Sequence, residues 1–328
     1  MLFYFYSLCS FYSLFSKLES KTKEKKQRLL ILLGPTGVGK STTAVEIARA
    51  FDGEVISCDS MQVYRGFDIG TDKIPPENRE GVAHYLLGII DPSVQFTAAD
   101  FVEHALSAVQ TIQAKKKLPI ITGGTGLYLK ALVDGLFPEG KKDPLIRQKL
   151  EEEAETEGLE NLWKRLEDID PVYARKIGKN DSLRIIRALE VYHSTHMPIS
   201  DHFLNTRSHI KDFFVLQIGL KLERQELYRR IEQRVDRMFE LGIIEEAEGL
   251  FRSGADASWP PFRALGYKHV LSHLRGDMSV QDAIELTKKD TRHYAKRQMT
   301  WFRKMEGVLW FSPQDFSSIA KTIEAFLE

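Results

Sequence analysis

The chain has 328 residues, of which 43% are hydrophobic and 28% are charged, so it is long enough for one globular domain with an insertion or for two domains. Its 46 Lys and Arg residues balance 46 Asp and Glu residues, which excludes a protein that attracts nucleic acid through its overall charge, so any basic surface must be local. The two cysteines, Cys9 and Cys58, form neither a metal motif nor a disulfide framework, and they fit a reducing compartment.

The first 28 residues differ in composition from the rest. Residues 1–15 are apolar and aromatic, and residues 17–28 are mainly basic, whereas a secretory signal places its basic residues first. The apolar run is also shorter than the about 20 residues that a helix needs to cross a bilayer. We therefore expect 1–28 to be an extension outside the fold, with a weak membrane anchor as the alternative.

A glycine-rich segment follows the first predicted strand, Leu29–Leu33, and precedes a predicted helix that begins at Thr42. This order is typical of a phosphate-binding loop (P-loop), in which backbone N–H groups and the helix N-terminus surround an anion. Lys40 would supply a mobile cation, and the Ser41 hydroxyl could ligate Mg²⁺. The loop predicts a polyphosphate ligand without indicating which one. Its residues are Gly34, Pro35, Thr36, Gly37, Val38, Gly39, Lys40 and Ser41.

Two further polar segments follow predicted strands. Asp59 comes after the strand at 54–58, where it could hold Mg²⁺ through water, act as a general base, or cap the turn with its side chain. Thr125 lies in a glycine-rich turn after the strand at 118–122, where its hydroxyl could bond a phosphate oxygen or cap the next helix. Alternating strands and helices predict a parallel α/β sheet, which binds ligands at the carboxyl ends of its strands. The three polar segments should therefore meet at one edge of the sheet.

The character of the chain changes after about residue 137. Helical patterns with many charges follow, and no strand pattern returns until 213–218. We therefore interpret 138–208 as a helical insertion in an α/β core that comprises 29–137 and 209–328. The core is predicted to be a parallel P-loop sheet with helices on both faces. The predicted helices lie at 98–116, 127–132, 147–166, from 171, at 181–193, at 224–241 and within 243–305, and a last strand lies at 308–311.

Basic residues gather in three places although the net charge is zero. Arg184 and Arg187 share a helix face at spacing i, i+3, and Arg263 and Lys268 lie close together in the sequence. Residues 288–304 contain seven basic residues and one acidic residue, interleaved with aromatic side chains. Such a pattern suits a nucleic-acid strand with unstacked bases, and a solvated basic helix face is the alternative.

Five segments together resemble the bacterial tRNA dimethylallyltransferases, also called tRNA isopentenyltransferases. They are the phosphate loop and the segments at 59–73, 123–128, 180–191 and 263–268. The segments at 59 and 123 are specific to this family, whereas the phosphate loop is shared with many others. The resemblance implies a cytoplasmic enzyme that moves the dimethylallyl group of dimethylallyl diphosphate to N6 of adenosine 37 in tRNA and releases diphosphate.

The resemblance also implies roles for individual residues. Asp59 would be the general base that takes the N6 proton, Thr125 would bond the bridging oxygen, and Mg²⁺ at Ser41 would help to neutralise the leaving diphosphate. The helical insertion would hold the anticodon stem-loop. We expect a monomer, because the sequence shows no clear dimer surface, and no membrane partner. The implied tRNA contacts are Asp59, Ser60, Met61, Gln62, Arg147, Leu183, Arg184, Ile185, Ile186, Arg187, Arg263, Ala264, Leu265, Gly266, Tyr267 and Lys268.

Three alternatives explain part of the pattern. A P-loop kinase of a small nucleotide would explain the phosphate loop and Asp59, but it would not need the segment 123–128 or the basic clusters. An adenylate isopentenyltransferase acts on a free nucleotide and would not need paired arginines in a helical insertion. An RNA-binding ATPase without transferase chemistry would explain the basic helices but not Asp59 opposite Thr125.

Overall fold

The structure, a computed structural model, describes residues 27–136 and 144–328. Most of the extension expected at 1–28 therefore lies outside the described residues. Its boundary was placed two residues too late, because Gln27 and Arg28 begin β1 (Gln27–Leu33) and pair with Phe213 and Phe214 of β5 (Phe213–Leu220). Within the described part of the chain, no helix is both long enough and apolar enough to cross a membrane.

The core is a parallel sheet of six strands in the order β3-β2-β4-β1-β5-β6. The remaining strands are β2 (Gly53–Cys58), β3 (His84–Tyr85), β4 (Leu118–Gly123) and β6 (Val308–Phe311). Every residue of β2 and β4 is buried, as expected for central strands that are covered on both faces. The predicted parallel α/β sheet is confirmed, and β3 is a strand that the sequence did not indicate.

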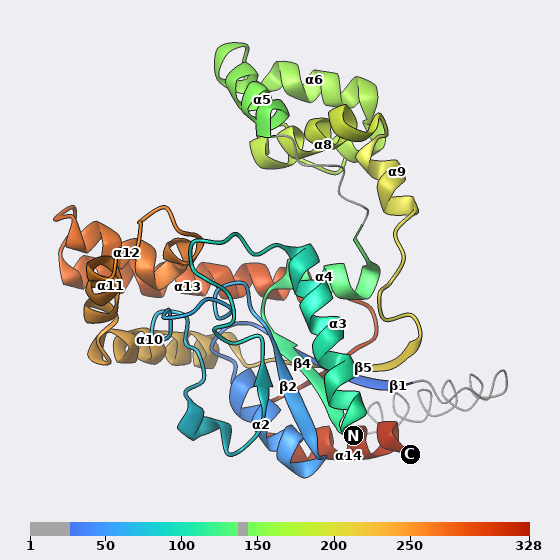
Figure 1. Cartoon of the computed structure of the whole chain (residues 1–328), viewed down its shortest axis with the longest axis vertical. Helices are drawn as coiled ribbons and strands as arrows, with labels where there is room; N and C mark the ends of the chain where they lie inside the picture. Colours follow the sequence, from blue (N-terminus) through green and yellow to red (C-terminus); the bar gives the residue numbers. More distant parts are fainter. Residues whose placement is uncertain (1–26, 137–143) are drawn as a thin grey trace.

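Helices cover both faces of the sheet, as predicted (Figure 1). Leu30 and Leu32 of β1 pack with α2 (Lys40–Ala50), α10 (Arg224–Glu240) and α14 (Phe316–Leu327) in one hydrophobic cluster. The alternate residues Leu29 and Ile31 belong to the opposite cluster, with α3 (Ala98–Ala114), α4 (Gly126–Asp134) and α12 (Leu265–Leu274). Because successive side chains of a strand point to opposite faces, one apolar strand supports both layers.

The C-terminal part of the core adds a group of helices that reaches one side of the molecule (Figure 1). These are α11 (Ile243–Arg252), the short 3-10 helix η2 (Pro260–Arg263), α12 and the long α13 (Val280–Phe302). A further 3-10 helix, η1 (Pro76–Arg79), follows the loop after β2. Helix α13 packs mainly against α12 and α10, and Gln298 near its C-terminal end reaches the loops after β1 and β4. Its buried residues are Ala283, Thr287, Thr291, Ala295, Gln298 and Phe302.

The helices of the predicted insertion stand apart from the sheet and have a hydrophobic cluster of their own (Figure 1). One helix was expected at 147–166, but the structure has two, because Gly158 adopts a φ of 87° that ends the helical run. Asp170 and Asp181 cap the following helices by accepting hydrogen bonds from backbone N–H groups, as expected for such residues. The elements are α5 (Pro144–Thr156), α6 (Leu159–Ile169), α7 (Pro171–Ala174), α8 (Ser182–Thr195) and α9 (Ile199–Leu204).

Candidate active site

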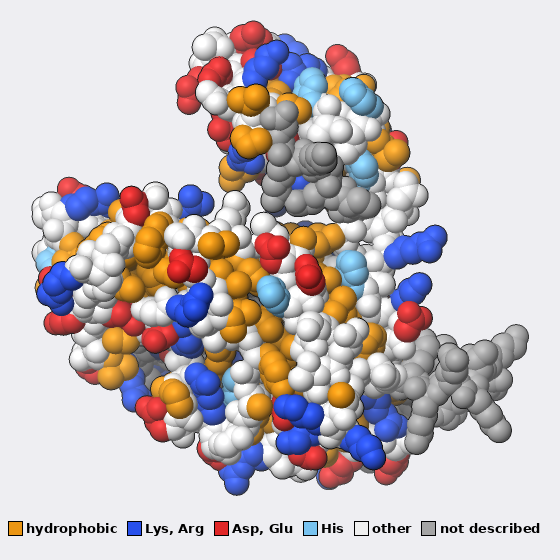
Figure 2. All heavy atoms as spheres, viewed as in Figure 1, with side chains coloured by type: hydrophobic (Ala, Val, Ile, Leu, Met, Phe, Trp, Pro, Cys, Tyr) orange, Lys and Arg blue, Asp and Glu red, His pale blue; other side chains and the backbone are white. Residues whose placement is uncertain are grey.

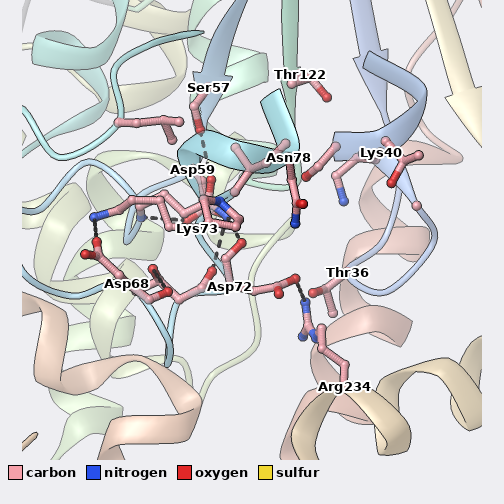
Figure 3. Close-up of a pocket in the computed structure, with 18 of the residues that line it drawn as sticks. Thr36, Lys40, Ser57, Asp59, Asp68, Asp72, Lys73, Asn78, Thr122 and Arg234 are labelled. Carbon is pink, nitrogen blue, oxygen red and sulfur yellow. Dashed lines mark hydrogen bonds and ion pairs between the residues drawn. The ribbon is translucent and has the colours of Figure 1, made fainter. Parts of the chain in front are cut away.

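A cavity of about 960 Å³ opens where the polar segments after β1, β2 and β4 come together. Asp59 and the phosphate loop both line it, although 18 residues or more separate them in sequence. Figure 3 shows Lys40, Asp59 and Arg234 around this space. The loop at 68–78 and the helix α10 supply the remaining walls. Parallel sheets place ligands at this edge because the loops and helix N-termini that follow the strands converge there.

The phosphate loop has the backbone that anion binding requires. Gly37 and Gly39 have φ values of 79° and 105°, which side chains with a Cβ atom rarely adopt. Helix α2 begins at Lys40, and no side chain caps its first turn, so the N–H groups there can face a ligand. Of the predicted loop residues, Thr36, Gly37, Gly39, Lys40 and Ser41 line the cavity. The other three, Gly34, Pro35 and Val38, are buried beneath it.

Lys40 is held inside the loop that it serves. Its Nζ donates a hydrogen bond to the carbonyl oxygen of Pro35 at 2.9 Å. Burial lowers the pKa of Lys40 to about 8, with a smaller contribution from Arg234, while Asp59 and Asp72 oppose the shift. An anion bound in the loop would favour the charged form. The lysine is therefore a cation whose charge is coupled to the presence of the ligand.

Asp59 is fixed by its own turn. Its Oδ1 accepts hydrogen bonds from the backbone N–H groups of Met61 at 2.9 Å and Gln62 at 3.3 Å, so the turn-capping alternative describes one oxygen of the carboxylate. None of the described residues donates a hydrogen bond to the other oxygen, Oδ2. That oxygen can accept a proton or contact a metal-bound water without breaking the turn.

Thr125 stands at the N-cap position, directly before α4, but its side chain does not cap the helix. Its Oγ1 accepts a hydrogen bond from the backbone N–H of Ser60 at 3.1 Å, and its own N–H donates to the Cys58 carbonyl at 3.4 Å. Thr125 therefore ties the turn after β4 to the turn that carries Asp59. It does not itself line the cavity, and its hydroxyl proton remains able to donate to a ligand oxygen.

Several residues at the site were not singled out from the sequence. Arg234 of α10 forms an ion pair with Asp72 at 3.0 Å, and both side chains line the cavity. Arg230 lies one turn before Arg234 and lines the same wall, and this i, i+4 spacing of arginines is the signal that could have found them. Tyr294 of α13 lies near Asp59. Burial raises the pKa of its phenol, and the negative charge of Asp59 raises this pKa further.

Comparison with known proteins identifies the family. A family model described as IPP transferase matches residues 62–305. The chain belongs to the IPP transferase family. A tRNA dimethylallyltransferase of Geobacter metallireducens is 46% identical over 305 residues, which cover 93% of this chain and 99% of the relative. Another from Acetivibrio thermocellus is 46% identical over 297 residues, which cover 90% and 95%.

Solved structures agree with this family assignment. The tRNA isopentenylpyrophosphate transferase of Bacillus halodurans is 38% identical, with a TM-score of 0.68, over 92% of this chain and 97% of that one. A eukaryotic dimethylallyltransferase acting on tRNA is 30% identical, with a TM-score of 0.76, over 89% of this chain and 75% of that one. The resemblance drawn from the sequence is confirmed, and the protein is a transferase. These relatives support neither a kinase nor an adenylate isopentenyltransferase.

In this IPP transferase, the residues predicted to contact tRNA divide by burial. Leu183 is 69% exposed, and Arg184, Arg263 and Lys268 are exposed as well. Four other members of the predicted contact set are buried inside the protein in this structure, and their contact with tRNA stays a prediction. These are Ile185, Ile186, Gly266 and Tyr267. The partly exposed members are Ser60, Met61, Gln62, Arg147, Arg187, Ala264 and Leu265.

Two of the predicted contact residues instead hold the cavity wall. Tyr267 donates to Glu246 and accepts from the backbone N–H of Gly70 at 3.2 Å. The same glutamate accepts from the N–H groups of Asp68 and Ile69, at 2.9 Å each. The side-chain amide of Gln62 donates to the carbonyl oxygens of Thr71 and Asp72 at 3.2 and 3.1 Å. These bonds fix the loop that carries Asp72.

The arginines of the insertion are anchored by a buried carboxylate. Glu190 is 4% exposed and forms ion pairs with Arg187 at 3.0 Å and Arg147 at 3.8 Å. Arg184 lies one turn before Arg187 on α8. It forms an ion pair with Asp181, the residue that caps this helix. The space-filling view shows an open cleft between the insertion helices and the α12–α13 side of the core (Figure 2). The exposed basic residues of both parts therefore belong to elements that border this cleft.

The site also fits the metal expected from the sequence. Within the described ranges, no group of three or more His, Cys, Asp or Glu side chains could hold a metal ion. Mg²⁺ does not require such a cage, because it commonly binds through one or two protein oxygens, water and substrate phosphates. The Ser41 hydroxyl is exposed at the first turn of α2 and lines the cavity. A hydroxyl in this position is a suitable ligand for Mg²⁺ on a bound diphosphate.

Proposed function

We propose that this protein transfers the dimethylallyl group of dimethylallyl diphosphate to N6 of adenosine 37 in tRNA, in the cytoplasm, and releases diphosphate. The observation that carries the proposal is the placement of a phosphate loop and a half-free carboxylate, Asp59, in one cavity, in a chain of the IPP transferase family. A phosphate loop alone would suit many reactions. The carboxylate opposite the loop suits one in which the nucleophile must lose a proton.

The leaving group is the first requirement of this chemistry. The N6 amine is a poor nucleophile, because its lone pair is delocalised into the adenine ring, so it needs a reactive electrophile. An allylic diphosphate provides one, since positive charge that develops on the allylic carbon is delocalised. The N–H groups of Gly39 and Lys40, together with the Lys40 ammonium, would stabilise the departing diphosphate. Mg²⁺, held by Ser41 and the diphosphate oxygens, would supply additional positive charge.

The proton is the second requirement. As the N6–carbon bond forms and the carbon–oxygen bond to diphosphate breaks, the amine must lose one proton. Oδ2 of Asp59 would accept it, while the N–H groups of Met61 and Gln62 hold Oδ1 and fix the orientation of the carboxylate. Thr125 would donate its hydroxyl proton in a hydrogen bond to the bridging oxygen. The Thr125 oxygen accepts a hydrogen bond from the Ser60 N–H, so the hydroxyl proton of Thr125 is free to point at a ligand.

RNA recognition would use the cleft and its exposed cations. Adenosine 37 lies in a loop of the anticodon arm, where a base can be unstacked and drawn into a pocket. We infer that Arg184 on the insertion, and Arg263 and Lys268 on the core, contact the anticodon stem-loop from opposite sides. Zero net charge concentrates RNA attraction at such local surfaces. All of the proposed site residues come from one chain, so we propose a monomer as the working form.

The test is a transfer assay. Protein, Mg²⁺ and dimethylallyl diphosphate labelled in the prenyl group are incubated with unmodified tRNA or with AMP. We expect the label in tRNA and at N6 of position 37. A transcript with guanosine at position 37 is the matched control, because it lacks the N6 amine. Label in AMP alone, or ATP turnover without transfer, would contradict the proposal.

A further inference from the structure

A buried amide on α13 joins two loops of the candidate active site, the phosphate loop after β1 and the turn after β4. Gln298 is 5% exposed. Its Oε1 accepts the backbone N–H of Thr36 in the phosphate loop, and its Nε2 donates to the carbonyl oxygen of Gly124 beside Thr125, both at 2.8 Å. The two partners are backbone groups of different loops, so the amide spans the gap between them. Among the described residues, the hydrogen bonds that join 35–37 to 124–125 run through this one side chain.

Each loop has its own internal support. In the phosphate loop, the Val38 N–H and the Lys40 ammonium both donate to the Pro35 carbonyl. In the other turn, Thr125 is held by the Cys58 carbonyl and the Ser60 N–H. Both loops are anchored at their bases by the sheet, where Leu33 of β1 pairs with Gly123 of β4. Removal of the Gln298 amide should therefore leave the local shape of each loop intact. Only the position of one loop relative to the other should change.

The close approach of the amide depends on the glycine at position 124. A Cβ atom added at Gly124 would lie 2.3 Å from Nε2 of Gln298, while its next neighbours would be at 3.5 and 3.7 Å. Gly124 is therefore the residue that allows the amide to reach the carbonyl. A buried N–H or carbonyl without a partner is unfavourable, so the two backbone groups keep the amide in this one orientation.

We propose that Gln298 is a positioning residue for prenyl transfer, which aligns the loop that binds diphosphate with the Thr125 and Asp59 turns that act on the other end of the reaction. It touches neither substrate, since it is buried, and it acts through Thr36 and Gly124. A misalignment of about 1 Å between reacting groups can lower the rate about 10²-fold. The inference rests on the proposed function, and it predicts an effect on kcat and not on substrate affinity.

The first test compares three proteins in the transfer assay. Gln298→Met keeps the approximate length of the side chain and removes the hydrogen bonds to Thr36 and Gly124. Gln281→Met makes the same chemical change on the exposed first turn of α13. We expect Gln298→Met to lower kcat about 10²-fold with the KM values for dimethylallyl diphosphate and tRNA unchanged, and Gln281→Met to match wild type. A loss confined to the KM for tRNA, or an unchanged kcat in a folded Gln298→Met protein, would overturn the proposal.

A second variant separates alignment from folding. A protonated Gln298→Glu side chain has an O–H donor and a carbonyl acceptor in the place of the amide, whereas the ionised form cannot donate to Gly124. Burial favours the protonated form, so kcat relative to wild type should rise as the pH falls. Gly124→Ala, which displaces the amide from the other side, should reproduce the kcat loss. A pH-independent ratio for Gln298→Glu, or a wild-type kcat for Gly124→Ala, would refute the role. If the wild-type protein itself transfers no prenyl group, the proposed function is refuted, and not the role of Gln298.

Discussion

Diphosphate affinity should fall about tenfold when the pH rises from 7 to 9, because Lys40 must carry a proton to bind the anion. The free protein holds the pKa of Lys40 at about 8, below its ordinary value of 10.5, chiefly because the group is buried in the loop. A bound diphosphate replaces the lost hydration with negative charge, which moves this pKa back toward or above the ordinary value.

The magnitude follows from proton linkage. With a free-state pKa of about 8, Lys40 is about nine-tenths protonated at pH 7 and about one-tenth at pH 9. If the complex keeps the proton throughout, the dissociation constant rises by the ratio of these fractions, which corresponds to about 1.4 kcal/mol. The terminal phosphate of an esterified diphosphate such as dimethylallyl diphosphate titrates at about pH 6, so this ligand does not contribute in the window. Above pH 8, binding should also take up a proton.

Isothermal titration calorimetry with dimethylallyl diphosphate, in the absence of tRNA, measures both quantities, and two buffers of different ionisation enthalpy report the proton uptake. Lys40→Arg is the matched control, because a guanidinium stays charged over the whole range. Its affinity should be independent of pH from 7 to 9, whatever its absolute value. A flat profile for the wild type, or an equal slope in the arginine variant, would refute this account of the loop.

Three further outcomes are expected. Asp59→Asn keeps an acceptor for the turn N–H groups but cannot take a proton, so transfer should fall about 10²–10⁴-fold with tRNA affinity unchanged in filter binding; an equal loss of affinity would make Asp59 a binding residue. Arg184→Ala should weaken tRNA binding and reduce the salt dependence of that binding, at an unchanged Tm. Arg187→Ala should weaken binding and also lower the Tm, because it leaves the buried Glu190 with one fewer cation. Identical Tm values for the two variants would contradict this distinction. Glu246→Ala should lower the free energy of unfolding by about 3 kcal/mol in urea titrations, since it removes the acceptor of four hydrogen bonds in the cavity wall; a loss below the error of the titration would refute that support.

The sequence was sufficient for the parts of the site that depend on local chemistry. The phosphate loop requires glycines at fixed positions and a helix directly after it, and Asp59 directly follows a buried apolar strand. Such features survive in the order of the residues, because each is made by neighbours in the chain. The caps at Asp170 and Asp181 are local in the same sense, because each accepts its capping hydrogen bond from a backbone N–H three positions later.

Long-range contacts were beyond this kind of reasoning. Gln298 bonds to residues that lie 262 and 174 positions away, and it resembles any other polar residue on a basic helix. Arg234 acquires its role from Asp72, which another part of the fold brings to it. The burial of Tyr267 has the same origin, because Glu246 and Gly70 surround it from two different segments. A motif therefore located these regions but could not distinguish a side chain that faces RNA from one that holds a loop.

The order of strands has a consequence for the size of the reaction that this sheet can accommodate. Strands β1 and β2, which precede the phosphate loop and Asp59, are not neighbours, because β4 lies between them. Neighbouring strands lie about 4.8 Å apart, so the two strand ends are separated by about 10 Å. That span is enough for a phosphate, a bridging oxygen, a carbon and an amine nitrogen in a line. In the proposed reaction, β4 would act as a spacer between the two strand ends, and Thr125, which follows β4, would lie between the diphosphate and the base.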